Sequence, residues 1–279
     1  MSTSTTLRQD EIDNKNAEFW NELCGSQLAR QLGITDDSPA SLKRFDDWYF
    51  DFYPYLNDHI PFADLKGKKV LEVGLGYGTV AQRIASSGAH YHGLDIAAGP
   101  VAMARHRCRL VGAMDAVVRQ GSILEPPFAD GSFDWVVAIG CLHHTGNLPL
   151  AIEVVRRLLT SGGQAAIMVY SATSYRQLAL APFGTLSRQL KGLYVPYSPP
   201  VSTARQRAAY DANVEGDAAP QTEFVTRTEL RHLCSRFSRV KIRSENIGAE
   251  GPLRRFPRPT LNKWLGPVVG LDLYCRLVK

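Results

Sequence analysis

From Lys68 onward, short apolar runs alternate with amphipathic segments along the chain. Such runs indicate strands that are buried on both faces, and apolar residues spaced three and four apart indicate helices between them. The alternation predicts an α/β fold, with a doubly wound, mostly parallel sheet and helices on both of its faces. The expected strands cover 69–73, 91–96, 116–120, 133–139 and 164–170, with helices over 99–111 and 148–159.

The remaining segments surround this core. Two more strands, 239–247 and 271–278, follow a helix over 226–237 and complete a seven-stranded sheet with an antiparallel hairpin. Helices over 16–33 and 41–57 precede the core, and the polar residues 1–15 predict disorder. The proline-rich stretch after the fifth strand reads as a functional insertion. We therefore expect four parts: an N-terminal helical cap or lid (1–65), an α/β core (66–170), a substrate-facing insertion (171–225) and the completion of the sheet (226–279).

Seven aromatic residues crowd the segment from Phe45 to Tyr55. They have two compatible interpretations. The rings can be buried where a cap helix packs on the core, or they can line a substrate cavity beneath a lid. Tyr53 is the candidate substrate-binding residue of this segment.

Three glycines, Gly74, Gly76 and Gly78, follow the first strand at alternate positions. Glycine at such a turn lets a ligand approach the backbone where a Cβ would clash. The third glycine comes one residue too early for the dinucleotide fingerprint, and Glu72 beside the turn would repel a pyrophosphate. The carboxylate suits a ligand that carries an ammonium group, such as an amino acid joined to a nucleoside.

The acidic-x-Gly-x-Gly-x-Gly pattern resembles the first motif of the class I, Rossmann-like S-adenosylmethionine-dependent methyltransferases. The strand that begins Phe133-Asp134-Trp135-Val136 and leads to Leu142-His143-His144 is similar to small-molecule members of that family. The resemblance implies S-adenosyl-L-methionine as the cofactor. It also implies in-line methyl transfer without metal to an oxygen or nitrogen of a small molecule, for example in natural-product or glycan-precursor biosynthesis.

Further cofactor residues are expected at the ends of the next strands. Asp95 stands where a carboxylate can accept hydrogen bonds from both ribose hydroxyls, and Ile96 beside it can cover an adenine. Ser122 occupies a position where the family commonly has Asp, and its hydroxyl can still accept a bond from the adenine amino group. The other candidates are Ile123, whose backbone can reach the ring, and Gly140 and Cys141, which the resemblance places along the methionine part.

Candidate catalytic and substrate residues follow from position. His143 and His144 come after the fourth strand, and either can take the proton of a substrate hydroxyl. One of two adjacent histidines is expected to be structural, and we prefer His144 as the base. In the insertion, Tyr210, Asn213 and Glu223 are candidates for contact with the substrate.

The charge of the chain leaves alternatives open. The net charge of +5 combines +8 from Leu186 onward with −3 before it. A basic C-terminal third suits an RNA methyltransferase as one alternative, although no aromatic interleaving accompanies the arginines and nucleic acid is not the expected partner. A cofactor-binding protein of the same fold that has lost catalysis is another. A third alternative, a dehydrogenase, would require that NAD and not S-adenosylmethionine bind at the glycine-rich turn.

Cysteine usage and hydropathy bear on location. No apolar run approaches the ~20 residues of a membrane helix, and the first residues lack the apolar core of a secretory signal. The five cysteines are scattered without metal-ligand spacing. These features predict a cytoplasmic protein with reduced thiols, no metal site and no membrane partner. The sequence leaves the oligomeric state open.

Overall fold

The computed structural model describes residues 8–22, 26–191, 197, 201–248 and 250–279. Within these ranges it has a seven-stranded sheet in the order β3-β2-β1-β4-β5-β7-β6. The pairs from β3 to β5 are parallel, and β7 is antiparallel to both β5 and β6. The predicted sheet with its final hairpin is thereby confirmed. The strands are β1 (Lys69–Val73), β2 (His90–Asp95), β3 (Val117–Gln120), β4 (Phe133–Ile139), β5 (Leu159–Tyr170), β6 (Arg239–Glu245) and β7 (Asp272–Val278).

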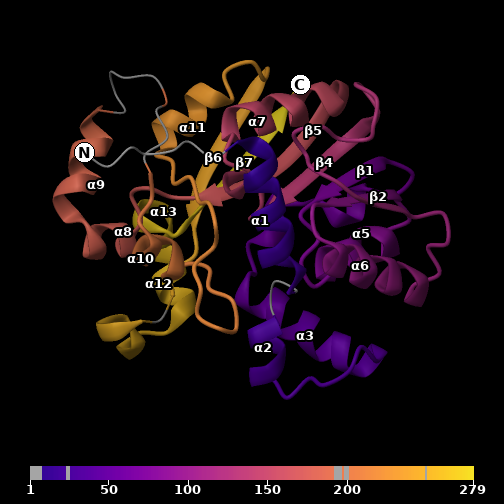
Figure 1. Ribbon diagram of the computed structural model, residues 1–279, viewed down its shortest axis with the longest axis horizontal. Helices are drawn as coiled ribbons and strands as arrows, with labels where there is room; N and C mark the ends of the chain where they lie inside the picture. The colour runs from indigo at the N-terminus through magenta and orange to yellow at the C-terminus, as the bar shows by residue number, and fades with distance from the viewer. Residues whose placement is uncertain (1–7, 23–25, 192–196, 198–200, 249) are drawn as a thin grey trace.

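Helices cover both faces of the sheet because successive strand residues point in opposite directions. Leu71 and Val136 pack in a core cluster with the apolar face of α7, whereas Val70 and Val137 pack in a second cluster with α5 and α6. In Figure 1, α5 and α6 lie on one side of the N-terminal helices, and α8, α10, α12 and α13 lie on the other. The helices around the core are α5 (Thr79–Ser86), α6 (Ala98–Leu110), α7 (Leu148–Leu158) and α11 (Arg227–Leu233). The others are α1 (Gln9–Asn21), α2 (Ser26–Gln31), α3 (Pro39–Phe52), α4 (Leu56–His59), α8 (Tyr175–Leu180), α9 (Pro182–Lys191), α10 (Ala204–Ala208), α12 (Arg258–Trp264) and α13 (Gly266–Val269), with 3-10 turns η1 (Phe62–Asp64), η2 (Leu142–His144) and η3 (Gly251–Arg255).

The N-terminal region departs from expectation. Helix α1 already begins at Gln9, so the predicted disorder of residues 1–15 is wrong for 9–15. Few apolar residues mark this helix, but its polar side chains bind the core. Asn16 is buried and donates to the carbonyl of His144 at 2.7 Å, and Gln9 donates to that of Thr145 at 2.8 Å. The predicted helix over 41–57 is divided into α3 and α4 near Pro54.

Strand β5 begins at Leu159, five residues earlier than predicted. Its pairing with β4 shifts register between Phe133 and Trp135, and Gly162 adopts a positive φ of +74° within the irregular stretch. The division of the chain into four functional parts stays a prediction. In the described part of the chain, no helix is both long and apolar enough to cross a bilayer.

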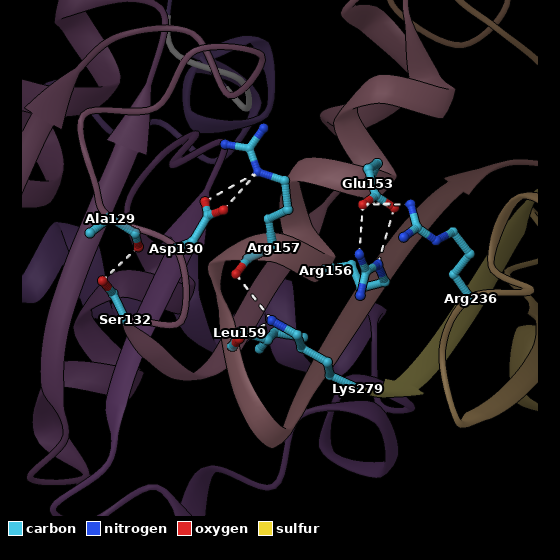
Figure 2. Close-up of polar contacts among 9 residues, drawn as sticks. All are labelled: Ala129, Asp130, Ser132, Glu153, Arg156, Arg157, Leu159, Arg236 and Lys279. Carbon is cyan, nitrogen blue, oxygen red and sulfur yellow. Dashed lines mark hydrogen bonds and ion pairs between the residues drawn. The ribbon is translucent and has the colours of Figure 1, made fainter.

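Ion pairs and backbone caps fix the end of α7 (Figure 2). Lys279 donates to the carbonyls of Arg157 and Leu159, which satisfies acceptors left open where the helix ends. Arg157 pairs with Asp130 at 3.1 Å. These residues line neither of the two cavities described below.

An aspartate of the cap binds the glycine-rich region of the core. Asp46 in α3 accepts from the hydroxyl of Thr79 at 2.7 Å and from Arg107 at 2.9 Å. Arg107 is fully buried, and its Nε and Nη2 atoms have no hydrogen-bond partner among the described residues. Asp46 is therefore the ionic partner of a guanidinium that has no access to water.

We expect Asp46→Ala to lower the free energy of unfolding by about 2–4 kcal/mol, because it leaves a buried cation unpaired. Thermal unfolding followed by circular dichroism measures the effect. The matched control is Asp47→Ala, which removes an exposed partner of Lys43 and should cost about 0.5 kcal/mol or less. Equal losses in the two variants would contradict a specific role for Asp46.

Candidate functional site

The glycine-rich turn after β1 passes directly beside the end of β4. Gly74 has a φ of +76°, and a Cβ added to it would lie 2.5 Å from the Cβ of Cys141. Its amide donates to the carbonyl of Leu94 at 2.9 Å, and the Cys141 thiol donates to the carbonyl of Val73 at 3.0 Å. Only glycine fits at this position, which brings the loops after β1, β2 and β4 together.

Asp95 ends β2 and organises the same edge of the sheet. One carboxylate oxygen accepts from the amide of Leu75 at 2.7 Å, and the other accepts from the amide of Ala97 at 2.9 Å. Burial raises the pKa of this carboxyl to about 6, although both amides favour the ionised form. Each oxygen keeps lone-pair capacity for a further donor, as a ribose diol requires.

A first cavity, partly open to solvent, lies at the carboxyl ends of β1, β2 and β4. Most of the predicted cofactor residues line it together with His144, namely Gly74, Gly76, Asp95, Ile96, Ser122, Ile123, Gly140 and Cys141. One wall was not predicted: Asp13, Asn16 and Trp20 of α1 also line the cavity. No sequence signal indicated this wall, because their helix is mostly polar. The roles of these residues stay predictions.

Two of the predicted cofactor residues lie elsewhere. Gly78 does not line the first cavity; it precedes α5 with a φ of +73°, and a Cβ there would lie 2.7 Å from the side chain of Arg107. Glu72 lines the second cavity, described next, and accepts a hydrogen bond from the hydroxyl of Tyr91 at 2.6 Å. Burial raises the pKa of Glu72 to about 8, against the hydrogen bond from Tyr91. The predicted role of Glu72 beside a ligand ammonium stays a prediction.

A second, larger cavity adjoins the first, since Trp20, Gly74, Gly76 and Ile139 line both. Helix α3 and the insertion form much of its wall. Tyr53, Tyr210 and Asn213 line it, and their predicted contact with the substrate stays a prediction. Its aromatic side chains are Phe19, Trp20, Phe45, Trp48, Tyr49, Tyr53, Tyr77 and Tyr210. Of the two interpretations of the aromatic cap, the lining of a cavity therefore holds for several of these rings.

His144 and Asp211 meet where the two cavities join. His144 lines the first and Asp211 the second, and the imidazole Nε2 lies 3.5 Å from Oδ2 of Asp211. The Nδ1 atom is 2.7 Å from the carbonyl of Gln221, so it carries the proton of the neutral ring and leaves a lone pair on Nε2. Tyr170 donates to the other oxygen of Asp211 at 3.1 Å. Asp211 was not predicted, because 67 residues separate it from its histidine.

Burial affects both members of this pair. It lowers the pKa of His144, which the nearby Asp211 partly restores. It raises the pKa of Asp211, which His144 and Tyr170 counteract. Nε2 of His144 and Oδ2 of Asp211 are buried atoms without hydrogen-bond partners among the described residues. The arrangement can therefore receive a proton from a group placed at the junction.

Two predicted residues are not at this junction. His143 is fully buried and lines neither cavity, and burial holds its pKa well below the usual value. Its position agrees with the expectation that one of the two histidines is structural, and the assignment stays a prediction. Glu223 also lines neither cavity; it accepts from the amide of Leu148 at the start of α7 and from the hydroxyl of Tyr197. Glu223 thus caps a helix inside the fold, and its predicted contact with the substrate stays a prediction.

Within the described ranges, no group of three or more His, Cys, Asp or Glu side chains is arranged to hold a metal ion. Cys108, Cys141, Cys234 and Cys275 are free thiols, and Cys24 lies outside the described residues.

Residues 71–167 match the family model described as a methyltransferase domain. This part of the chain is therefore similar to methyltransferases. Its matched range runs from β1 to β5 and includes the glycine-rich turn, Asp95 and His144. Two relatives align with parts of the chain. One is a demethylmenaquinone methyltransferase of Tropheryma whipplei, 30% identical over 42% of this chain and 46% of that protein. The other is a ubiquinone biosynthesis O-methyltransferase of Pseudomonas aeruginosa, 34% identical over 37% of this chain and 44% of that protein.

The chain thus spans less than half the length of these curated relatives. Solved structures match over a longer range. An S-adenosylmethionine-dependent methyltransferase from Mesorhizobium loti aligns with 81% of this chain and 97% of its own, with a TM-score of 0.52 and 17% identity. One from Methanosarcina mazei gives a TM-score of 0.51 and 18% identity over 81% of this chain and 97% of its own. This likeness shows that the chain has the fold of these structures.

Proposed function

We propose that the protein is an S-adenosylmethionine-dependent O-methyltransferase that acts on the hydroxyl of a small, flat, apolar acceptor. The observation that carries the proposal is the His144–Asp211 pair at the junction of the two cavities. A hydroxyl must lose its proton when it accepts a methyl group, and a neutral imidazole whose Nε2 carries a lone pair beside Asp211 can take it.

The residues of the first cavity fit the cofactor. Asp95 can accept from the ribose hydroxyls, and the backbone at Gly74 and Gly76 is open to close approach. Ile96 and Ile123 provide apolar surface for a base, with Ser122 as a polar neighbour. The bound cofactor supplies an electrophilic methyl group on a positively charged sulfonium, which becomes neutral on transfer. The protein's own task is then to align the acceptor, exclude water and hold the proton.

The second cavity supports the choice of acceptor. Its aromatic lining favours a flat apolar body. No Lys, Arg or His is among the described residues that line it, whereas Glu22, Glu72 and Asp211 are. An acceptor with a carboxylate or phosphate would meet no cation there. The aligned parts of the relatives named for demethylmenaquinone and ubiquinone biosynthesis agree with an apolar ring as the acceptor.

Turnover tests the proposal. The protein is incubated with S-adenosylmethionine and a panel of phenols, matched anilines and matched aryl carboxylates, and release of S-adenosylhomocysteine is measured. We expect release with phenols at a rate above that of both other sets. Transfer to anilines alone would move the acceptor to nitrogen. Cofactor binding without release in any set would favour the catalytically inactive alternative.

We expect the affinity for S-adenosylhomocysteine to rise with pH between about 6.5 and 8. Burial raises the pKa of Glu72 to about 8, and a ligand ammonium nearby would favour its ionised form. Binding then releases a proton, so a lower proton concentration strengthens it, by up to about tenfold per pH unit. Calorimetry in two buffers of different ionisation enthalpy measures the proton release.

Glu72→Gln is the matched variant, because it keeps an acceptor for the Tyr91 hydroxyl and removes the titration. Its affinity should be nearly constant over this pH range. A variant that keeps the wild-type pH dependence would show that another group is responsible.

A further inference from the structure

One surface of the molecule is both basic and apolar, and the proposed methyl transfer does not use it. It is formed by residues 251–270, which contain η3, α12 and α13, and we call it the 251–270 surface. It includes Arg254, Arg255, Arg258 and Lys263 and has no Asp or Glu. In Figure 1 the gold segment that contains α12 projects from the lower left of the molecule.

Large apolar side chains are exposed on this surface. Trp264 is 69% exposed, Val268 71% and Phe256 56%. Exposed apolar groups that gather beside charged ones mark interaction sites more often than scattered single residues do. The Lys263 ammonium lies 5.6 Å from the centroid of the Trp264 ring, so a cation and an amphipathic ring are presented together.

The surface is attached to the cap beside the second cavity. Arg258 donates to the carbonyls of Ile247 and Phe52, and its guanidinium lies 3.5 Å over the Phe52 ring. Phe52 ends α3 and stacks on Trp48, which lines the second cavity. Arg258 is thus engaged within the protein, whereas Arg254, Arg255 and Lys263 are exposed.

We propose that the 251–270 surface docks on an anionic lipid bilayer. Exposed basic residues gain from the negative potential of such a membrane, and Trp and Phe side chains suit the boundary between headgroups and acyl chains. The phosphates of RNA would pair with the cations and its bases could stack on the aromatic rings. RNA has little apolar surface, however, to cover Val268 and Leu265. The sequence prediction of no membrane partner considered only spanning segments, and surface docking needs none.

Sedimentation with lipid vesicles tests the proposal without cofactor or acceptor, so its outcome is independent of the proposed function. We expect binding to vesicles of phosphatidylcholine with phosphatidylglycerol, little binding to phosphatidylcholine alone, and weaker binding as salt rises. Arg254→Glu with Arg255→Glu should weaken binding by at least about tenfold. The matched control is Lys66→Glu with Lys68→Glu, an equal charge change at exposed residues before β1 that should bind nearly as the wild type does.

Fluorescence identifies the surface that makes contact. Brominated lipids should quench Trp264, and Trp264→Tyr should remove most of that quenching. Thermal unfolding of each variant should stay close to that of the wild type. Equal binding to neutral vesicles, equal loss in the two charge variants, or binding of a structured RNA without binding of vesicles would each overturn the proposal.

Discussion

His144→Asn is expected to lower kcat for methyl transfer by about 10²–10³-fold, while S-adenosylhomocysteine still binds. The asparagine amide can replace Nδ1 as the donor to the carbonyl of Gln221, so the local fold is kept. What the variant loses is the lone pair of Nε2, which faces Asp211 at the junction of the cavities. Steady-state kinetics with the best phenol, together with calorimetry for the cofactor product, measures the two effects separately.

Asp211→Asn tests the proton path through the dependence of kcat on pH. A purely structural role of Asp211 would leave that pH dependence unchanged. The carboxyl of Asp211 raises the pKa of His144 against the effect of burial, so its removal lowers that pKa further. The acid limb of the profile of kcat against pH should therefore move to lower pH, with a smaller kcat on the plateau. A wild-type kcat in His144→Asn, or an unmoved limb in Asp211→Asn, would contradict the assigned proton path.

Asp95→Asn is expected to weaken S-adenosylhomocysteine binding by about 10²-fold, or about 2.7 kcal/mol. Both carboxylate oxygens of Asp95 accept backbone amides, from Leu75 and Ala97. An asparagine side chain would direct an N–H group at one of those amides, which disturbs the glycine-rich turn and removes an acceptor for the ribose. Isothermal calorimetry gives the affinity.

Asp134→Asn is the matched control for this change. Asp134 also accepts a backbone amide, that of Lys69 at 2.9 Å, but at the amino end of β4 and outside both cavities. The affinity of the Asp134→Asn variant for S-adenosylhomocysteine should equal that of the wild type. A similar loss in both variants would indicate general destabilisation, and wild-type affinity in Asp95→Asn would remove this carboxylate from the cofactor site.

Local patterns predicted the parts of the site that short segments build. The turn at Gly74 and the carboxylate of Asp95 follow directly from strands whose apolar runs are plain in the sequence. The sheet itself follows from the same runs. These features depend on residues that are close to one another in the sequence. The local sequence is therefore enough to predict them.

Contacts between distant segments could not be predicted in this way. Asp211 and Glu223 are both acidic residues of the insertion, yet one reaches the junction of the cavities and the other caps α7. Their immediate sequences do not distinguish them. The first half of α1 was predicted as disordered for a related reason, since its attachment depends on Gln9 and Asn16 donating to carbonyls beyond residue 140. Burial also raises the pKa of Glu72, and the residue type alone does not reveal this shift.

The two residues of the proposed proton transfer come from different parts of the chain. His144 belongs to the range that matches the methyltransferase family model and lines the first cavity, whereas Asp211 belongs to a loop whose neighbours line the second. Exchange of that single loop during evolution would alter selectivity and basicity in one step, while the methyl donor would remain bound as before. Proteins that descend from such an ancestor could form different methylated products, or lose activity, without any change in the sheet.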